Sequence, residues 1–250
     1  MELFMKGQTA IVTGASQGIG RAITRALALE GVQVMAVARN RELLDGLKAD
    51  ISAAGGVPPI TLIAELTHAG SSALIAERAL AELGQVNILV NNAGRSQPLD
   101  VVGLDDKWQE SFILEFERPR QLTQVLLPHF MERKQGVVLN VISTFELKSI
   151  NASAVAKTAL TAWSKQLSAQ VGRYNVRVNC LQPGLIDTEN TRRMFTPQQR
   201  KDFAEANIAL GDFGEPEDMA DTAVFLVSPR ARYVTGAVWN VDGGLRYYPF

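Results

Sequence analysis

Eight residues near the start of the sequence, Thr13 to Gly20, read T-G-A-S-Q-G-I-G and have the composition of a phosphate-binding turn. An apolar run, Thr9 to Val12, precedes them, and residues 21–30 carry apolar side chains at helical spacing. A tight turn from strand to helix directs backbone N–H groups and the positive end of the helix at one point. Glycine suits backbone with positive φ or close approach to a ligand. We therefore expect a nucleotide phosphate here, although a purely structural turn has a similar composition.

Ser153 and Lys157 could also do chemistry, because they lie four residues apart in a helical stretch and so share one face. A serine hydroxyl activated by a lysine amine is the nucleophile of one class of hydrolases. The sequence shows no oxyanion hole to accompany this pair, so we do not favour hydrolysis. The two histidines, His68 and His129, and the single cysteine, Cys180, are scattered, so no metal site is expected.

Strands and helices alternate along the whole chain. The sequence predicts strands at 9–12, 33–38, 60–64, 86–91, 137–142, 176–181 and 237–241. It predicts helices at 21–30, 41–54, 69–83, 104–118, 119–134, 153–174 and 216–227, with Pro119 breaking or kinking the chain between the fourth and the fifth. This order indicates an α/β fold with a single doubly wound parallel sheet of the Rossmann type and helices on both faces. One domain spanning residues 1–250 should bind its ligands at the carboxyl ends of the strands.

The composition is typical of a cytoplasmic enzyme. Hydrophobic residues make up 46% of the chain, which is enough for a sizeable core. The net charge is −1, with no block of like charge, which argues against nucleic acid or an anionic membrane as partner. No segment is apolar over the length of a bilayer, and the first residues, M-E-L-F-M-K-G, lack the pattern of a signal peptide.

Four motifs together resemble the short-chain dehydrogenase/reductase family. They are Thr13-Gly14-(x)3-Gly18-Ile19-Gly20, Asn91-Asn92-Ala93-Gly94, Asn179-(x)3-Pro183-Gly184 and Asp242-Gly243-Gly244, and they span nearly the whole chain. The sequence is most similar to 3-oxoacyl-carrier-protein reductases and related carbonyl reductases. The resemblance implies an oxidoreductase that uses a nicotinamide dinucleotide and acts on a small-molecule carbonyl or conjugated carbonyl substrate.

The resemblance also implies which residues contact the cofactor. The pyrophosphate would be wrapped by residues of the first motif, and the adenosine and nicotinamide ribose would lie against the loop of the second. Residues after the sixth strand would flank the nicotinamide. A pair of residues that follows the third strand would lie beside the adenine, and a helix lysine would hold the nicotinamide ribose. These positions are Gly14, Ser16, Gln17, Gly18, Ile19, Glu65, Leu66, Asn92, Ala93, Gly94, Lys157, Pro183, Gly184, Ile186 and Thr188.

The end of the second strand bears on the choice between cofactors. An acidic residue there would pair with the ribose hydroxyls of NAD, but this chain has Ala38 followed by Arg39. An arginine fork suits a 2′-phosphate, so we favour NADP(H) over NAD(H), with a solvated loop arginine as the alternative. Two departures weigh against a simple assignment: Gln17 replaces a basic residue of many NADP-using relatives, and Glu65 stands where relatives usually have Asp or Asn.

The catalytic positions match the family only in part. The family uses a serine, a tyrosine, a lysine four residues after the tyrosine, and an asparagine in a kinked helix. Ser143 and Lys157 match the serine and the lysine, but Ser153 occupies the tyrosine position and Glu115 the asparagine position. A phenol starts near pKa 10, whereas a serine hydroxyl is a far weaker acid that Lys157 cannot tune into a comparable proton donor. The ordinary mechanism should therefore be impaired.

Two further interpretations stay open beside the hydrolase. The first is an oxidoreductase with a modified proton path, in which Glu115 serves as a substitute acid; alternatively, Glu115 forms an ion pair with Lys157 or is an exposed helix residue. Mitochondrial dienoyl-CoA reductases resemble this case, but the tyrosine they use falls near Phe145 here. The second is a nucleotide-binding sensor or partner subunit without catalysis.

We also expect a homo-oligomer, either a tetramer or a dimer. Relatives associate through the helices that correspond to 119–134 and 153–174 and through the last strand. The C-terminal tail, Tyr247-Tyr248-Pro249-Phe250, is rich in aromatic side chains and is expected to pack against a neighbouring subunit.

Overall fold

The computed structural model describes residues 2–102, 105–143 and 149–246. Its centre is a seven-stranded sheet in which every neighbouring pair of strands is parallel, in the order β3-β2-β1-β4-β5-β6-β7. The strands are β1 (Thr9–Thr13), β2 (Gln33–Ala38), β3 (Ile60–Ile63), β4 (Ile88–Asn91), β5 (Gly136–Val141), β6 (Val176–Pro183) and β7 (Val238–Val241). The order reverses between β1 and β4, so the sheet is doubly wound, as the sequence predicts.

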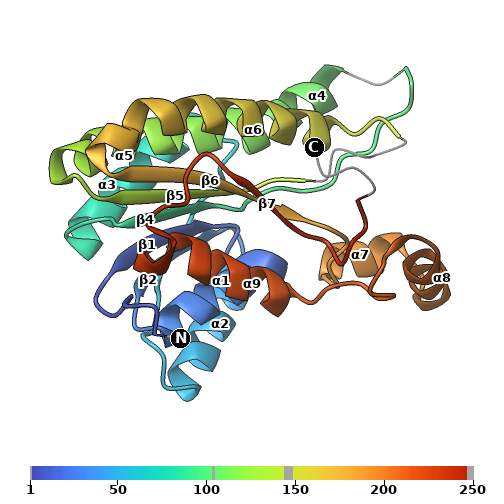
Figure 1. Ribbon diagram of the computed structural model, residues 1–250, viewed down its shortest axis with the longest axis horizontal. Coiled ribbons are helices and arrows are strands. Elements are labelled where there is room, and N and C mark those ends of the chain that lie inside the picture. The colour runs from blue at the N-terminus through green and yellow to red at the C-terminus, as the bar shows by residue number, and fades with distance from the viewer. Residues whose placement is uncertain (1, 103–104, 144–148, 247–250) are drawn as a thin grey trace.

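Helices cover both faces of the sheet (Figure 1). The helices α1 (Gly18–Leu29), α2 (Arg41–Ala53) and α9 (Pro216–Val227) lie on one face, and α3 (Ser71–Leu83), α5 (Arg118–Arg133) and α6 (Ala152–Val171) lie on the other. The shorter α4 (Asp105–Phe112) leads into α5, whereas α7 (Glu189–Met194) and α8 (Pro197–Asn207) form a lobe beyond the sheet. Single turns of 3₁₀-helix follow α6 at Gly172–Tyr174 and α9 at Pro229–Ala231.

Alternate residues of the central strands feed two separate cores. Ala10 and Val12 of β1 pack in a cluster with residues of α1 and α9, whereas Ile11 between them packs in a cluster with residues of α3 and α5. This alternation follows from the pleat of a strand, which turns successive side chains to opposite faces. Because both faces are apolar, the strands read as continuous hydrophobic runs in the sequence.

The largest departure from the sequence prediction concerns the long helical stretch on one face. We expected Pro119 to break or kink it, and the helix continues from α4 to α5 through a π-helical turn, Ile113–Glu117, just before the proline. Pro119 is the second residue of α5, directly after the π-turn, so its missing N–H falls where the regular i to i−4 hydrogen-bond pattern is already interrupted. The irregularity therefore precedes the proline and rotates the residues between 113 and 117.

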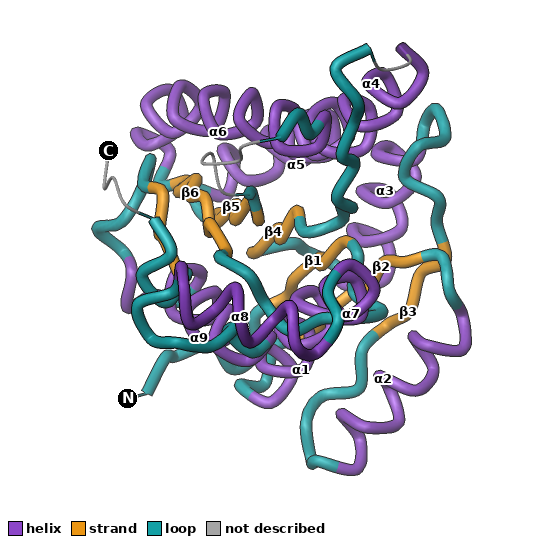
Figure 2. Tube along the Cα trace, turned by 90° about the vertical axis from the view of Figure 1, so that its right-hand side faces the viewer, coloured by secondary structure: helices purple, strands orange, loops and turns teal. Residues whose placement is uncertain are grey.

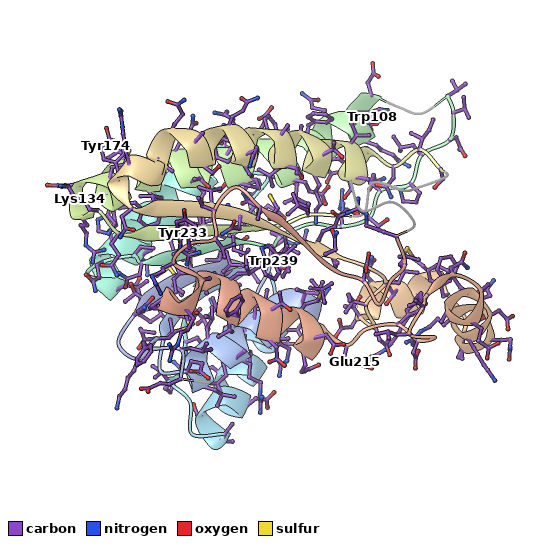
Figure 3. The ribbon with its side chains drawn as sticks, viewed as in Figure 1. Trp108, Lys134, Tyr174, Glu215, Tyr233 and Trp239 are labelled. Atoms are coloured by element: carbon purple, nitrogen blue, oxygen red, sulfur yellow. The ribbon has the colours of Figure 1, made fainter. Side chains whose placement is uncertain are left out.

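The carboxyl ends of the strands meet at one end of the molecule. Figure 2 views the molecule from this side, with α7 and α8 in front of the sheet. In Figure 3, Trp108 of α4 and Glu215 before α9 lie toward this end, whereas Lys134 and Tyr174 lie at the opposite end. Helices that could cross a membrane are not found in the described part of the chain.

Candidate functional site

The glycine-rich turn lies between β1 and α1, and α1 begins inside the motif, three residues earlier than we expected. Gly14 and Gly18 have φ values of +67° and +52°, which favour glycine. A Cβ added at Gly14 would lie 2.8 Å from the Cα of Ala93, and one added at Gly20 would collide with the Gly14 carbonyl oxygen. The turn therefore accepts no larger residue at these positions and leaves bare backbone at the surface of the site.

As far as the structure describes the chain, the N-terminus of α1 has no side-chain cap, and the Glu189 carboxylate lies near it, with Oε2 3.7 Å from a Cβ added at Gly18. Within this fully described helix, the N-cap residue Gln17 makes no side-chain hydrogen bond to the first turn, and that turn holds no acidic residue. The first N–H groups of a helix have no partners inside it and carry the positive end of its dipole. With the partly exposed Ser16 and Ile19 beside them, these groups fit a pyrophosphate.

The loop after β4 is tied to the glycine-rich turn by hydrogen bonds. The Thr13 hydroxyl accepts the N–H groups of Asn92 and Ala93 at 3.1 and 3.2 Å. The Asn92 amide donates to the carbonyl oxygens of Thr13 and Gly14 at 3.0 and 3.2 Å. Asn92 thus orders the turn with its side chain, and Thr13, which the sequence analysis placed only in a motif, holds the two loops together.

A buried amide chain supports the next layer of the site. Asn91 of β4 donates to Asn140 of β5 at 2.8 Å, and Asn140 donates to Ser164 of α6 at 2.8 Å. All three side chains are buried, so each hydrogen bond satisfies a polar group that would otherwise be costly. The chain fixes α6 relative to the carboxyl ends of β4 and β5.

Gly94, Glu115 and Lys157 converge from three different segments. A Cβ added at Gly94 would lie 2.7 Å from Glu115 Oε1 and 3.1 Å from Lys157 Nζ. Glu115 lies in the π-turn and is only 1% exposed, although a surface position was one alternative for it. Its Oε1 accepts the N–H of Arg95 at 2.6 Å, and its buried Oε2 has no hydrogen-bond partner among the described residues.

Lys157, in the group that it forms with Gly94 and Glu115, has a shifted pKa. Burial lowers the pKa of Lys157 below its usual value, and the carboxylate of Glu115 partly offsets that effect. The two side chains are not within ion-pair distance in the part of the chain that the structure describes. A lysine with a lowered pKa in a buried setting can give up a proton more readily than an exposed one.

The two candidate serines lie at the ends of β5 and α6. Ser153 is 5% exposed and lies in the first turn of α6, one helical turn before Lys157. The N-cap of this helix is Asn151, whose side chain accepts the N–H of Ala154 and donates to Ser96 Oγ at 3.0 Å. Ser143 is partly buried and follows β5 by two residues, and Phe145 lies outside the described residues.

The segment after β6 closes over the glycine-rich turn. Pro183 ends β6, and a Cβ at the next residue, Gly184, would lie 2.6 Å from Asp242 Cα, so the third and fourth motifs are in direct contact. Ile186 is buried, and Thr188 caps α7. A Cβ at Gly18 would lie 3.2 Å from Thr188 Cγ2, which places this segment beside the N-terminus of α1.

The lobe formed by α7 and α8 has a small apolar core and a set of ion pairs of its own. Phe195, Phe203 and Phe213 make edge-on or tilted ring contacts with centroids 5.8–6.3 Å apart. Asp187 accepts hydrogen bonds from Arg192 and Arg200 at 2.8 and 2.7 Å. Partial burial raises the pKa of Asp187, but these two arginines outweigh it and hold the pKa below its usual range. The lobe is therefore held together by contacts among its own residues.

Arg39 and Glu65 face each other at the edge of the sheet. Arg39 follows β2, Glu65 lies two residues after β3, and Arg39 Nη1 lies 3.2 Å from Glu65 Oε2. Leu66 beside them is buried. The sequence predicts both charged side chains near the adenosine but does not predict that they contact each other. Only the register of β2 and β3, Ala38 opposite Ile63, brings the two residues together.

The residues set aside from chemistry lie in ordinary structural settings. Cys180 is buried in β6, and burial raises the pKa of its thiol to about 11. His129 bonds the backbone N–H of Val86 at 3.1 Å, and His68 is exposed. Trp239 of β7 makes an edge-on contact with Phe225.

This chain is similar to known proteins in both sequence and structure. The family profile described as enoyl-(acyl carrier protein) reductase matches residues 14–246. The 3-oxoacyl-(acyl-carrier-protein) reductase of Thermotoga maritima is 30% identical over 246 residues, which cover 96% of this chain and 98% of that protein. L-Sorbose reductase from Gluconobacter frateurii, solved with NADPH and L-sorbose, superposes with a TM-score of 0.93 at 29% identity, covering 99% and 100% of the two chains. A 7α-hydroxysteroid dehydrogenase solved with NADH superposes with a TM-score of 0.92 at 30% identity, covering 97% and 96%.

Proposed function

The chain belongs to the short-chain dehydrogenase/reductase family, and from this premise we propose that it is an NADP(H)-dependent oxidoreductase acting on a carbonyl or conjugated carbonyl compound. One observation carries the proposal: Glu115 and Lys157 lie so close to Gly94, in the loop that is tied to the glycine-rich turn, that a Cβ added there would lie 2.7 Å from Glu115 Oε1 and 3.1 Å from Lys157 Nζ. Groups that can hold a proton thus adjoin the loop expected to line the nicotinamide ribose. The NADPH complex of the sorbose reductase and the name of the Thermotoga relative support the cofactor and the substrate class.

The bound nicotinamide would supply or accept the hydride. The chain itself would bind the pyrophosphate at the N-terminus of α1 and orient the substrate oxygen with the Ser143 hydroxyl. Lys157 would hold the nicotinamide ribose and, with its lowered pKa, keep a mobile proton at Nζ. Ser153 lies one helical turn from that ammonium, and its hydroxyl could pass the proton to the substrate oxygen. Glu115 would hold the positive charge of Lys157 in place.

The cofactor assignment has a direct test. Titration of the native protein with NADPH and NADH, followed by nucleotide fluorescence, should show NADPH binding about tenfold tighter or more. A charge-assisted hydrogen bond is worth about 1.5–3 kcal/mol, and Arg39 offers one to the 2′-phosphate. Tighter binding of NADH would refute this use of Arg39, and tight NADPH binding without turnover on any ketone or enoyl thioester would favour the sensor.

A second test addresses the role of Glu115. Glu115→Gln keeps an oxygen that can accept the Arg95 N–H but removes the charge that raises the pKa of Lys157. The pKa of Lys157 should therefore fall further, and the alkaline limb of the kcat/KM profile for reduction should move to lower pH. The control is Glu110→Gln, because Glu110 pairs with Arg95 from an exposed position on α4. An unchanged profile in Glu115→Gln would exclude Glu115 from the proton path.

The remaining assignments are proposals of the same kind. We propose one domain over residues 1–250, supported by the single sheet that takes strands from both halves of the chain. A homo-oligomer is supported by the exposed apolar side chains of Val125 on α5, Val155 on α6 and Trp239 on β7, and sedimentation velocity would decide it. In Figure 3, Trp239 lies on β7 and Tyr233 in the turn that precedes this strand. The C-terminal tail lies outside the described residues, and a cytoplasmic location stays a prediction.

A further inference from the structure

The two side chains of the Arg39–Glu65 ion pair differ in their exposure to solvent. The Arg39 side chain is 69% exposed, whereas that of Glu65 is 27% exposed. Arg39 reaches its partner from the loop after β2, and of the residues that the structure describes, its guanidinium group contacts only Glu65, at 3.2 Å. An exposed arginine in such a contact can leave it at little cost, because surface ion pairs contribute little stability. The guanidinium is thus available to another anion.

Glu65, in contrast, is fixed in place. Its Oε1 accepts the backbone N–H and the hydroxyl of Thr67 at 3.1 and 3.0 Å. The buried Arg118 of α5 holds the same loop by donating to the carbonyl oxygens of Leu66 and Thr67 at 2.7 and 3.0 Å. The carboxylate therefore keeps its position when Arg39 moves.

Glu65 also keeps its negative charge. Partial burial raises its pKa, but the hydrogen bonds from Thr67 and Arg39 outweigh that effect and hold the pKa below its usual value. Near neutral pH, an anion that binds to Arg39 therefore meets a fixed carboxylate a few ångströms away. That carboxylate repels a phosphate, whereas it accepts a hydrogen bond from an uncharged ribose hydroxyl.

We propose that Glu65 is a specificity-determining residue that opposes Arg39, so that the chain discriminates between NADP(H) and NAD(H) less strongly than Arg39 alone would allow. Arg39 attracts the 2′-phosphate, and Glu65 reduces that attraction while leaving binding of the 2′-hydroxyl intact. The inference rests on the proposed binding of a nicotinamide dinucleotide. It assigns Glu65 a role in addition to its expected place beside the adenine.

The test is Glu65→Gln, which keeps the side-chain length and an acceptor for Thr67 while it removes the charge. NADPH and NADH are titrated by fluorescence, and 2′,5′-ADP and 5′-ADP by calorimetry, so that no readout depends on turnover. The dissociation constants of NADPH and 2′,5′-ADP should fall about three- to tenfold, and those of NADH and 5′-ADP should change less than twofold. The gain should shrink at high salt, because the charges are solvent-exposed.

The control is Glu82→Gln, which removes the acid of an exposed arginine–glutamate pair on α3, Arg78 and Glu82, outside the site. It should leave all four constants unchanged. Equal tightening of NADPH and NADH in Glu65→Gln, or weaker binding of NADPH, would overturn the inference while leaving the proposed function intact. Failure of the native protein to bind either dinucleotide would overturn both.

Discussion

Replacing Ser153 with tyrosine is expected to raise the rate of ketone reduction by about two to four orders of magnitude, the range that a positioned general acid contributes. A phenol has a pKa near 10, and an ammonium group one helical turn away lowers it toward neutrality. Ser153 lies in the first turn of α6, and Lys157 follows it on the same face. The substitution would supply a phenol one helical turn from Lys157, where the native chain carries a serine.

The measurement compares kcat/KM for a panel of ketones and enoyl thioesters. Ser153→Phe is the matched control, because it adds the same ring to a residue that is only 5% exposed but brings no hydroxyl. Thermal unfolding and NADPH titration of each variant show whether the ring is accommodated. Equal rates in the native protein and the tyrosine variant would contradict our account of the missing acid, as would equal rates in the tyrosine and phenylalanine variants.

Gly20→Ala is expected to abolish measurable dinucleotide binding and to lower the free energy of unfolding by about 1–3 kcal/mol, the usual cost of overpacking. The new Cβ would collide with the Gly14 carbonyl oxygen and with the Asn92 amide, two groups that are already hydrogen-bonded to each other. Relief of the collision requires the turn to move away from the loop after β4. Such a movement would displace the backbone that is expected to meet the pyrophosphate.

Gly46→Ala is the matched control for this prediction. Gly46 lies within α2, and a Cβ added there meets nothing within 4 Å. Alanine is about 1 kcal/mol better than glycine inside a helix, so this variant should be more stable than the native protein. Chemical denaturation and NADPH titration of the two variants measure the contrast. Native binding in Gly20→Ala would show that the turn does not hold the dinucleotide.

The order of elements could be predicted because local patterns determine it. The bounds of β2 and α9 agree with the sequence prediction, since apolar runs and a proline at the first helical turn mark them. The start of α1 was placed three residues late, because glycines within the motif suggested a turn rather than a helix. The π-turn at Ile113–Glu117 directly precedes Pro119, so the proline marked an irregularity in this stretch but did not indicate its form.

The sequence predicts which positions belong to the candidate site, but it does not predict which side chains contact one another there. Glu115 was identified from its place in the family pattern, yet its buried state and its bond to the Arg95 N–H depend on the π-turn. The pairing of Arg39 with Glu65 depends on the register between two strands that are separated by a whole helix. Such contacts arise from the tertiary fold, which spacing along the chain does not determine.

The separate core of the α7–α8 lobe bears on the rate of product release from the candidate site. Phe195, Phe203 and Phe213 pack mainly on one another rather than on the apolar layers beside the sheet. The chain joins the lobe to β6 and to α9, and the Leu210 N–H also donates to the Gly243 carbonyl oxygen at 3.0 Å, so a movement of the lobe as one body would break few contacts and leave the layers beside the sheet closed. A motion of that kind exposes few new apolar atoms, so its barrier is set by a handful of hinge torsions. Release could then proceed on the microsecond-to-millisecond timescale of lid opening.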